Sequence, residues 1–165
     1  NKYVEPSAES LKRIRAESAR VSKILGTVTP TRYWKGEFAR PVPGEASSSF
    51  GKRSILNGKP RSPHSGTDFK ASSGTPIKSP NSGVIVLVAD LYFAGNTVII
   101  DHGQGLYSYF AHLSSFDVKE GDKVERLDVV GRVGATGRVT GPHLHWTVRL
   151  VEARVDPLSL MAVVK

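Results

Sequence analysis

Four of the five histidines lie in segments where their spacing could support chemistry, and the clearest pair is His143 and His145. The run around them is strand-like, and residues two apart in a strand point to the same face of a sheet. These two imidazoles are therefore expected side by side, with Leu144 and Trp146 facing the core. Two charged imidazoles so close together would repel each other. A neutral imidazole bound to a metal ion avoids that cost, although a hydrogen-bonded pair of surface histidines would also explain the pattern.

A second segment runs from His64 to Asp68 and places an imidazole and a carboxylate on one face if it is extended. Gly66 lies between them and has no side chain, so a metal ion could fit in the gap; the alternative is a loop histidine and a turn-forming aspartate. Together the two segments supply two imidazoles and one carboxylate, which matches a catalytic zinc site with one position left for water. One of His143 and His145 would stay unligated beside that water, as a general base or a hydrogen-bond donor to an oxyanion.

The other two histidines lead to opposite expectations. His112 is near the end of a strand-like run, where a lone histidine is usually structural. In a sheet that also carries the two segments above, we expect it to be a second unligated imidazole at the site. His102 follows Asp101 in a predicted hairpin turn, and we expect it to be an exposed turn residue.

The elements that must position these residues are mostly strands. Five short runs rich in β-branched and aromatic residues are separated by Gly, Pro, Asn and Asp, and no long amphipathic helix interrupts them. The runs are Val84–Ala89, Thr97–Asp101, Leu106–Leu113, Val129–Val133 and Leu144–Leu150. This pattern predicts a mainly β, antiparallel domain over residues 40–165.

Residues 1–39 are predicted to form a helix and a linker outside that domain. Residues 7–25 have helical spacing, with Ser7 as the N-cap and Gly26 just past the end. The apolar stripe is narrow and the opposite face is basic, so the helix is expected to pack on its own domain or on an upstream region of the same precursor. Its acidic residues are expected to be solvated; they are Glu5, Glu9 and Glu17. Asn1 begins a charged segment without an initiator Met, which suggests a processed or trimmed chain.

Composition excludes several function classes. The 165 residues contain no cysteine, so disulfides and thiolate metal sites are ruled out. The formal charge of +8 favours an anionic partner, but residues 1–40 hold nine Lys and Arg against four Asp and Glu, so the excess lies mostly outside the predicted β domain. A nucleic-acid partner is therefore not expected. No apolar run is long enough for stable membrane insertion, and no signal peptide is visible.

The motifs together resemble the lysostaphin/LytM-type zinc metallopeptidases. The resemblance rests on His-x-x-x-Asp at 64–68, Ala-His-Leu at 111–113 and Gly-Pro-His-Leu-His-Trp at 141–146. It covers about residues 40–160 and leaves the N-terminal helix outside. It extends through further short matches, which are Arg40-Pro41, Ser49-Phe50-Gly51, Gly74-Thr75-Pro76, Asp101-His102-Gly103, Gly121-Asp122, Val133-Gly134, Thr136-Gly137 and Asp156-Pro157.

The resemblance implies a fold, a site and a substrate. The fold would be the antiparallel, duplicated-hybrid-motif type with a groove over the metal site. One Zn²⁺ per chain would be held by His64, Asp68 and His145, while His112 and His143 would flank the water and the scissile carbonyl. The substrate would be the peptide part of peptidoglycan, cut in its stems or crossbridges, in the periplasm, at the cell surface or outside the cell.

Two points of the resemblance stay open. Some members of this family have lost metal ligands and serve as non-enzymatic activators of other wall hydrolases, which is the alternative function here; this sequence has lost none of the five positions. Some members also place a Tyr shortly before the first ligand, and residues 55–63 contain none. Tyr92 is a candidate for the groove wall instead.

Overall fold

The computed structural model describes residues 6–44, 46–48, 55–56, 59–60, 66–137, 139, 141–150 and 153–163. The helices and strands of this part of the chain follow one another in the order α1 (Ala8–Leu25), β1 (Ala46–Ser48), β2 (Ile55–Leu56), β3 (Lys59–Pro60), β4 (Thr67–Phe69), β5 (Pro76–Lys78), β6 (Gly83–Leu91), β7 (Gly95–Gly103), β8 (Leu106–Leu113), β9 (Ser115–Phe116), β10 (Lys123–Val124), β11 (Val129–Arg132), β12 (Leu144–Leu150), β13 (Ala153–Val155) and α2 (Pro157–Val163).

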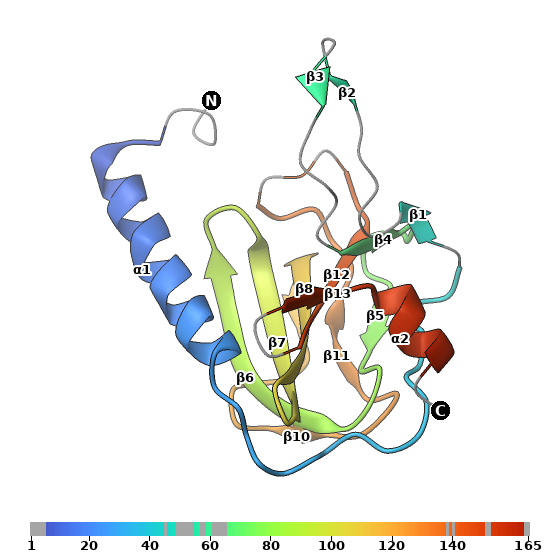
Figure 1. Cartoon of the computed structure of the whole chain (residues 1–165). Coiled ribbons are helices and arrows are strands. Elements are labelled where there is room, and N and C mark those ends of the chain that lie inside the picture. The colour runs from blue at the N-terminus through green and yellow to red at the C-terminus, as the bar shows by residue number, and fades with distance from the viewer. Residues whose placement is uncertain are drawn as a thin grey trace.

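The main sheet is antiparallel, which confirms the predicted fold class (Figure 1). It has eight strands in the order β1-β4-β12-β8-β7-β6-β10, with β13 pairing to β12, and a second sheet has the order β5-β11-β9. All five predicted runs lie on strands of these two sheets. Strand β12 is central to the site because it pairs with β4 on one side and β8 on the other.

The short helix α2 was not predicted from the sequence. Its start nevertheless follows a simple rule, because Asp156 Oδ1 accepts a hydrogen bond from the Leu158 amide at 3.0 Å and Pro157 occupies the first helical position. Hydrophobic periodicity gives little signal over a helix of only seven residues.

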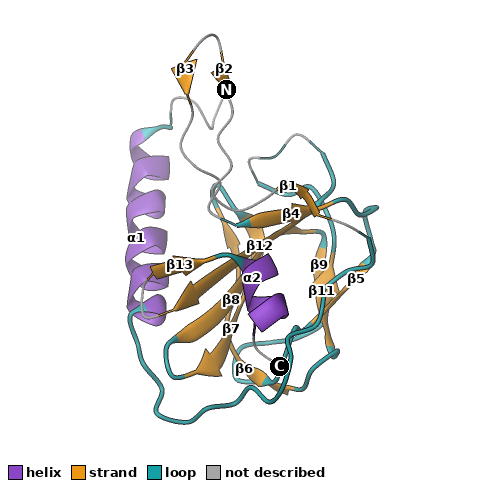
Figure 2. Ribbon diagram, turned by 45° about the vertical axis from the view of Figure 1, so that its right-hand side comes forward, coloured by secondary structure: helices purple, strands orange, loops and turns teal. Residues whose placement is uncertain are grey.

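The main sheet has two different faces. Phe110, Leu144 and Trp146 face the larger core and are fully buried. The opposite face carries a smaller cluster that includes Ile99 and Tyr107, and the end of α1 covers it through Leu25. The strand alternation of β8 and β12 therefore separates a core face from a face that is partly covered by α1 (Figure 2).

Helix α1 has the predicted bounds and packs on the domain itself. Ser7 caps its start by accepting a hydrogen bond from the Ser10 amide, and Gly26 ends it. The expectation that Glu17 is solvated is wrong, because its carboxylate accepts hydrogen bonds from the Tyr92 amide and the Arg13 guanidinium, both at 2.8 Å. The bond from Tyr92 attaches the helix to the turn between β6 and β7.

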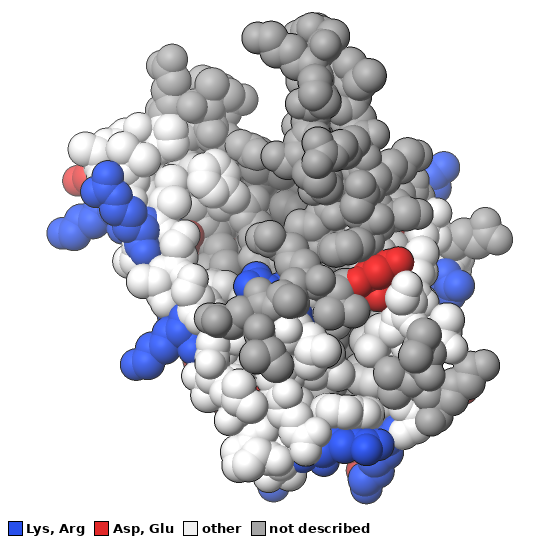
Figure 3. Space-filling view, in the orientation of Figure 1, with Lys and Arg blue, Asp and Glu red and all other residues white. Residues whose placement is uncertain are grey.

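Basic side chains lie on several parts of the surface. On the face shown in Figure 3, Lys and Arg side chains lie along the edge that α1 forms, and others lie at the bottom and at the right-hand edge. No helix in the described part of the chain has the length and apolar character needed to cross a membrane.

His102 contradicts its prediction as an exposed turn residue. It lies inside β7, is fully buried, and packs edge-on against Phe38. Its Nδ1–H donates to the Ser82 carbonyl at 2.8 Å, and its Nε2 lies 2.8 Å from Ser108 Oγ, which also accepts a hydrogen bond from Trp146 Nε1. Burial lowers the pKa of His102 from 6.5 to about 4, so this buried imidazole is neutral at physiological pH.

Candidate active site

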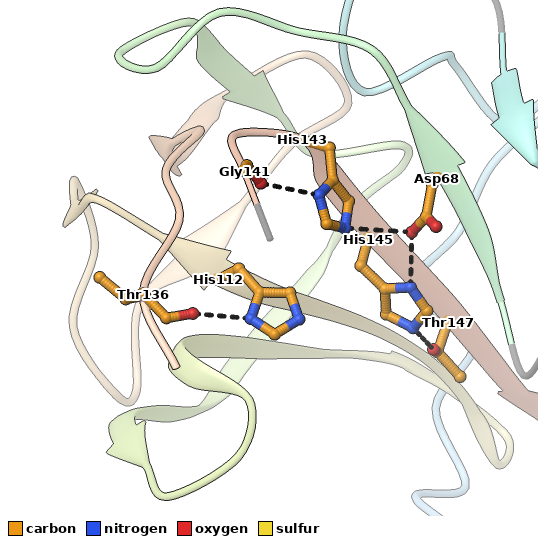
Figure 4. A network of polar contacts seen from close by, with 7 residues as sticks. All are labelled: Asp68, His112, Thr136, Gly141, His143, His145 and Thr147. Carbon is orange, nitrogen blue, oxygen red and sulfur yellow. Dashed lines mark hydrogen bonds and ion pairs between the residues drawn. The ribbon is translucent and has the colours of Figure 1, made fainter. Parts of the chain in front are cut away.

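The pairing of β12 with β4 brings two distant segments together. His145 lies directly opposite Asp68, and the two side chains meet with Nδ1 2.8 Å from Oδ1 (Figure 4). His143 lies beside them with its Nε2 3.5 Å from the same carboxylate oxygen. Leu144 and Trp146 are fully buried on the other face, which confirms the alternation predicted for this strand.

His112 reaches the site through an unusual backbone conformation. Its neighbour Ala111 lies opposite His145 and so shares the site face, and regular alternation would turn His112 toward the core. A positive φ of 65° at His112 changes this direction and brings its ring centroid to 5.7 Å from that of His143 and 6.4 Å from that of His145. This conformation costs about 1–3 kcal/mol for a residue other than glycine, and such strain is concentrated at functional sites.

Hydrogen bonds hold His112 in this position. Its backbone amide donates to the Ala94 carbonyl and its Nδ1 to the Thr136 carbonyl, both at 2.7 Å. In the neutral ring Nε2 is then the acceptor. Burial lowers the pKa of His112, while the bond to Thr136 opposes the shift and the neighbouring His145 and His143 add to it.

Thr136 supports the position of His112, and the sequence did not single it out. Its hydroxyl donates to the Leu113 carbonyl at 2.7 Å and accepts from the Asn96 amide at 3.0 Å. These two bonds attach the loop around Thr136, which lies between β11 and β12, to both β7 and β8. Gly95 makes this close approach possible, since a Cβ there would lie 2.4 Å from the Thr136 carbonyl carbon. The Thr136-Gly137 dipeptide was part of the family resemblance, but its role required the structure.

Thr147 is a second residue that was missed. Its hydroxyl lies 2.9 Å from His145 Nε2. The spacing of His145 and Thr147 on one strand face was the available signal. A hydroxyl can donate or accept, so Thr147 can hold this ring whichever nitrogen carries the proton.

Gly66 has a different role from the one expected. A Cβ there would lie 2.4 Å from the Trp146 carbonyl oxygen and 3.1 Å from His145 Cε1. The glycine therefore lets the chain approach β12 closely, and its missing side chain does not leave a gap. His64 lies outside the described residues.

The candidate groove wall also differs from the prediction. Tyr92 lines a hollow that faces Arg13 of α1 and the Thr136–Gly137 loop. The next residue, Phe93, lines the cavity that contains His112 and His145. Phe93, and not Tyr92, therefore lines the cavity that holds these predicted catalytic groups.

The donor atoms fit zinc chemistry as far as the structure describes them. Asp68 Oδ1 and His145 Nδ1 are ligand atoms of the types that zinc takes, and they converge on one point from two strands. The described residues contain no group of three or more His, Asp or Glu placed to hold a metal ion, and the third predicted ligand, His64, is not among them.

Comparison with known proteins identifies the same region. The pattern of Peptidase family M23 matches residues 62–157. A curated relative, the peptidoglycan DD-endopeptidase ShyA of Vibrio cholerae, is 45% identical over 101 residues, which cover 61% of this chain and 24% of the relative. The chain thus spans about a quarter of the length of that protein.

Solved structures agree with this match. A peptidase M23 from Pseudomonas aeruginosa has a TM-score of 0.84 at 45% identity and covers 93% of this chain and 63% of its own. A zinc-containing peptidase from Vibrio cholerae has a TM-score of 0.69 at 33% identity, covering 74% and 39% respectively. The catalytic domain of lysostaphin from Staphylococcus simulans has a TM-score of 0.64 at 30% identity, covering 72% and 92%. These similarities confirm the resemblance inferred from the sequence motifs.

Proposed function

Because the chain belongs to Peptidase family M23, a family of metallopeptidases, we propose that it is a zinc-dependent endopeptidase that cleaves peptide bonds in the stems or crossbridges of peptidoglycan. The observation that carries this proposal is the meeting of Asp68 and His145 on adjacent strands with His112 and His143 beside them. The name of the Vibrio cholerae relative and the zinc in a similar solved structure support the substrate and the metal. Such a substrate would place the enzyme in the periplasm or at the cell surface.

His64, Asp68 and His145 would hold the metal. Zinc bound there would supply a polarised water and a Lewis acid for the scissile carbonyl. Thr147 would orient His145, since its hydroxyl can accept the Nε2 proton when Nδ1 acts as the ligand.

The two remaining histidines would handle protons. His112 is suited to act as the general base, because its Nδ1–H is committed to Thr136 and its lowered pKa keeps Nε2 unprotonated at neutral pH. His143 is fixed by Nδ1 donating to the Gly141 carbonyl at 3.0 Å, with Nε2 toward Asp68. From there it would donate to the oxyanion or the leaving amine when protonated.

No observation in the described residues favours the non-enzymatic alternative. A regulatory module would not need His112 in a strained backbone conformation aimed at a pair of histidines. That strain is explained if His112 takes part in catalysis.

Two alanine variants test the roles separately. His145→Ala should lose both bound zinc and cleavage of purified peptidoglycan. His112→Ala should keep its zinc and lose cleavage, because it removes the base and no ligand. Arg132→Gln, on the smaller sheet, is the matched control and should change neither. Normal cleavage by His145→Ala would refute the assignment.

A further inference from the structure

A cavity of about 370 Å³ continues from the candidate site between the main sheet and α1. One side is formed by the helix and the β6–β7 turn, and the other by β8 and β12. The described lining residues are Val21, Leu25, Phe93, Ala94, Tyr109, Ala111, His112, His145, Thr147 and Arg149. The site already described explains the histidines and Thr147, but it leaves the apolar wall and Arg149 without a role.

Arg149 belongs to the same strand face as the predicted zinc ligand. Along β12, every second residue from His145 points to the same face, and these residues are His145, Thr147 and Arg149. All three line the cavity. At about 3.3 Å per residue, Arg149 lies roughly 13 Å along the strand from His145. An extended peptide with its scissile carbonyl near His145 would reach Arg149 with a backbone group about four residues away, or with a nearer residue if its side chain is long.

The helical wall of the cavity is held in place. The Arg13 guanidinium donates to the Asp90 carbonyl at 2.8 Å, and Arg20 pairs with Glu120 at 3.0 Å. Together with the bond from the Tyr92 amide to Glu17, these contacts attach α1 to β6 and to the loop before β10. Val21 and Leu25 therefore present a fixed apolar surface opposite Arg149.

Arg149 is the one Lys, Arg, Asp or Glu among the described residues that line the cavity. No acidic side chain is among the described residues that line it. The nearby Glu17 is already bonded to Arg13 and the Tyr92 amide. A guanidinium has five N–H donors, so Arg149 can keep a contact within the protein and still bind a carboxylate.

We propose that this cavity is a substrate subsite for a carboxylate-bearing part of the peptide, with its aliphatic portion against Val21, Leu25 and Phe93 and its carboxylate on Arg149. The inference rests on the proposed peptidase function for the identity of the ligand. Two parts of a stem peptide offer this chemistry, which are a side-chain carboxylate and the free C-terminus. In either case α1, although outside the matched family region, would help to determine substrate choice.

Binding of uncrosslinked stem peptides tests the subsite without any need for cleavage. The probes are synthetic stem peptides with diaminopimelate or lysine as the third residue, each with a C-terminal carboxylate or amide. The reference peptide has lysine and a C-terminal amide, so it lacks both the side-chain carboxylate of diaminopimelate and the C-terminal carboxylate. In a titration followed by NMR, the wild-type chain should bind at least one peptide that has one of these carboxylates about 10- to 100-fold more tightly than the reference. The preferred peptide identifies which carboxylate is recognised.

Variants assign the effect to the cavity. Arg149→Gln should abolish the preference for the carboxylate form, while Arg132→Gln should keep it. Val21→Trp should fill the cavity from the helix side and weaken binding of every peptide. Ala19→Trp, on the exposed side of the same helix, should not. The Val21→Trp pair keeps the test valid if Arg149→Gln does not fold.

The outcomes separate the subsite from the peptidase function. Equal affinity for the peptides with and without these carboxylates, or an unchanged preference in Arg149→Gln, would overturn the subsite even if the enzyme cleaves peptidoglycan. A carboxylate preference that depends on Arg149, in a chain that cleaves no wall preparation, would support the subsite and overturn the proposed peptidase function.

Discussion

Replacing His102 by glutamine should make the stability of the chain less sensitive to acid. The imidazole is fully buried, and its two nitrogens are used by Ser82 and Ser108, so the neutral ring fits the core and a charged ring does not.

The size of the effect follows from proton linkage. The pKa of His102 falls from 6.5 in an unfolded chain to about 4 in the fold. Between these pH values the unfolded state binds a proton that the native state does not. The contribution of neutral His102 to the free energy of unfolding is therefore fully present above pH 6.5 and is lost progressively as the pH falls to about 4. The full loss amounts to about 3 kcal/mol.

Urea unfolding between pH 7 and pH 4 measures this loss. His102→Gln should be less stable than the wild type at pH 7, by about 1–3 kcal/mol, because it disturbs a buried hydrogen-bond network. Its further loss on acidification should be about 3 kcal/mol smaller than that of the wild type, since the other titrating groups are shared. Parallel pH profiles for the two chains would refute the reasoning, as would an NMR titration showing His102 protonated at pH 6.

Two further substitutions test the supports of the site. Gly95→Ala should lower cleavage by at least 10-fold with zinc retained and should destabilise the fold by about 1–3 kcal/mol. The reason is that φ at Gly95 is +67° and the new methyl group would press on Thr136, which holds His112. Unchanged kcat in a normally folded variant would count against this role of the Thr136 loop. Thr147→Val should weaken zinc binding by about 10- to 100-fold in a competition titration, since it removes the hydroxyl that orients His145; wild-type zinc affinity would show that the hydroxyl is dispensable.

Strand alternation was the part of the site that could be predicted from the sequence. Alternation predicts that His143 and His145 lie side by side and that Leu144 and Trp146 are buried on the opposite face. Separately, the strand-like runs with turn residues between them predict the antiparallel sheet. Alternation depends only on local backbone geometry, so it can be read from a few residues. The choice of His145 over His143 as a ligand came from the family resemblance, and it remains a prediction.

The remaining features depend on contacts between distant residues. His112 faces the site because of a positive φ that no local pattern indicates for a histidine. His102 was assigned to a turn because glycines follow it, but β7 continues through Gly103 and buries the ring. The position of α1 is set by pairs such as Glu17 and Tyr92, which are 75 residues apart.

Digestion of purified peptidoglycan, followed by mass spectrometry of the released peptides, tests the central proposal most directly. The wild-type chain should release peptides cut within the stems or crossbridges, lose this activity with a chelator and recover it when zinc is restored. His112→Ala, with its zinc intact, should release none. Cleavage that persists after zinc is removed, or that persists in zinc-loaded His112→Ala, would contradict the account.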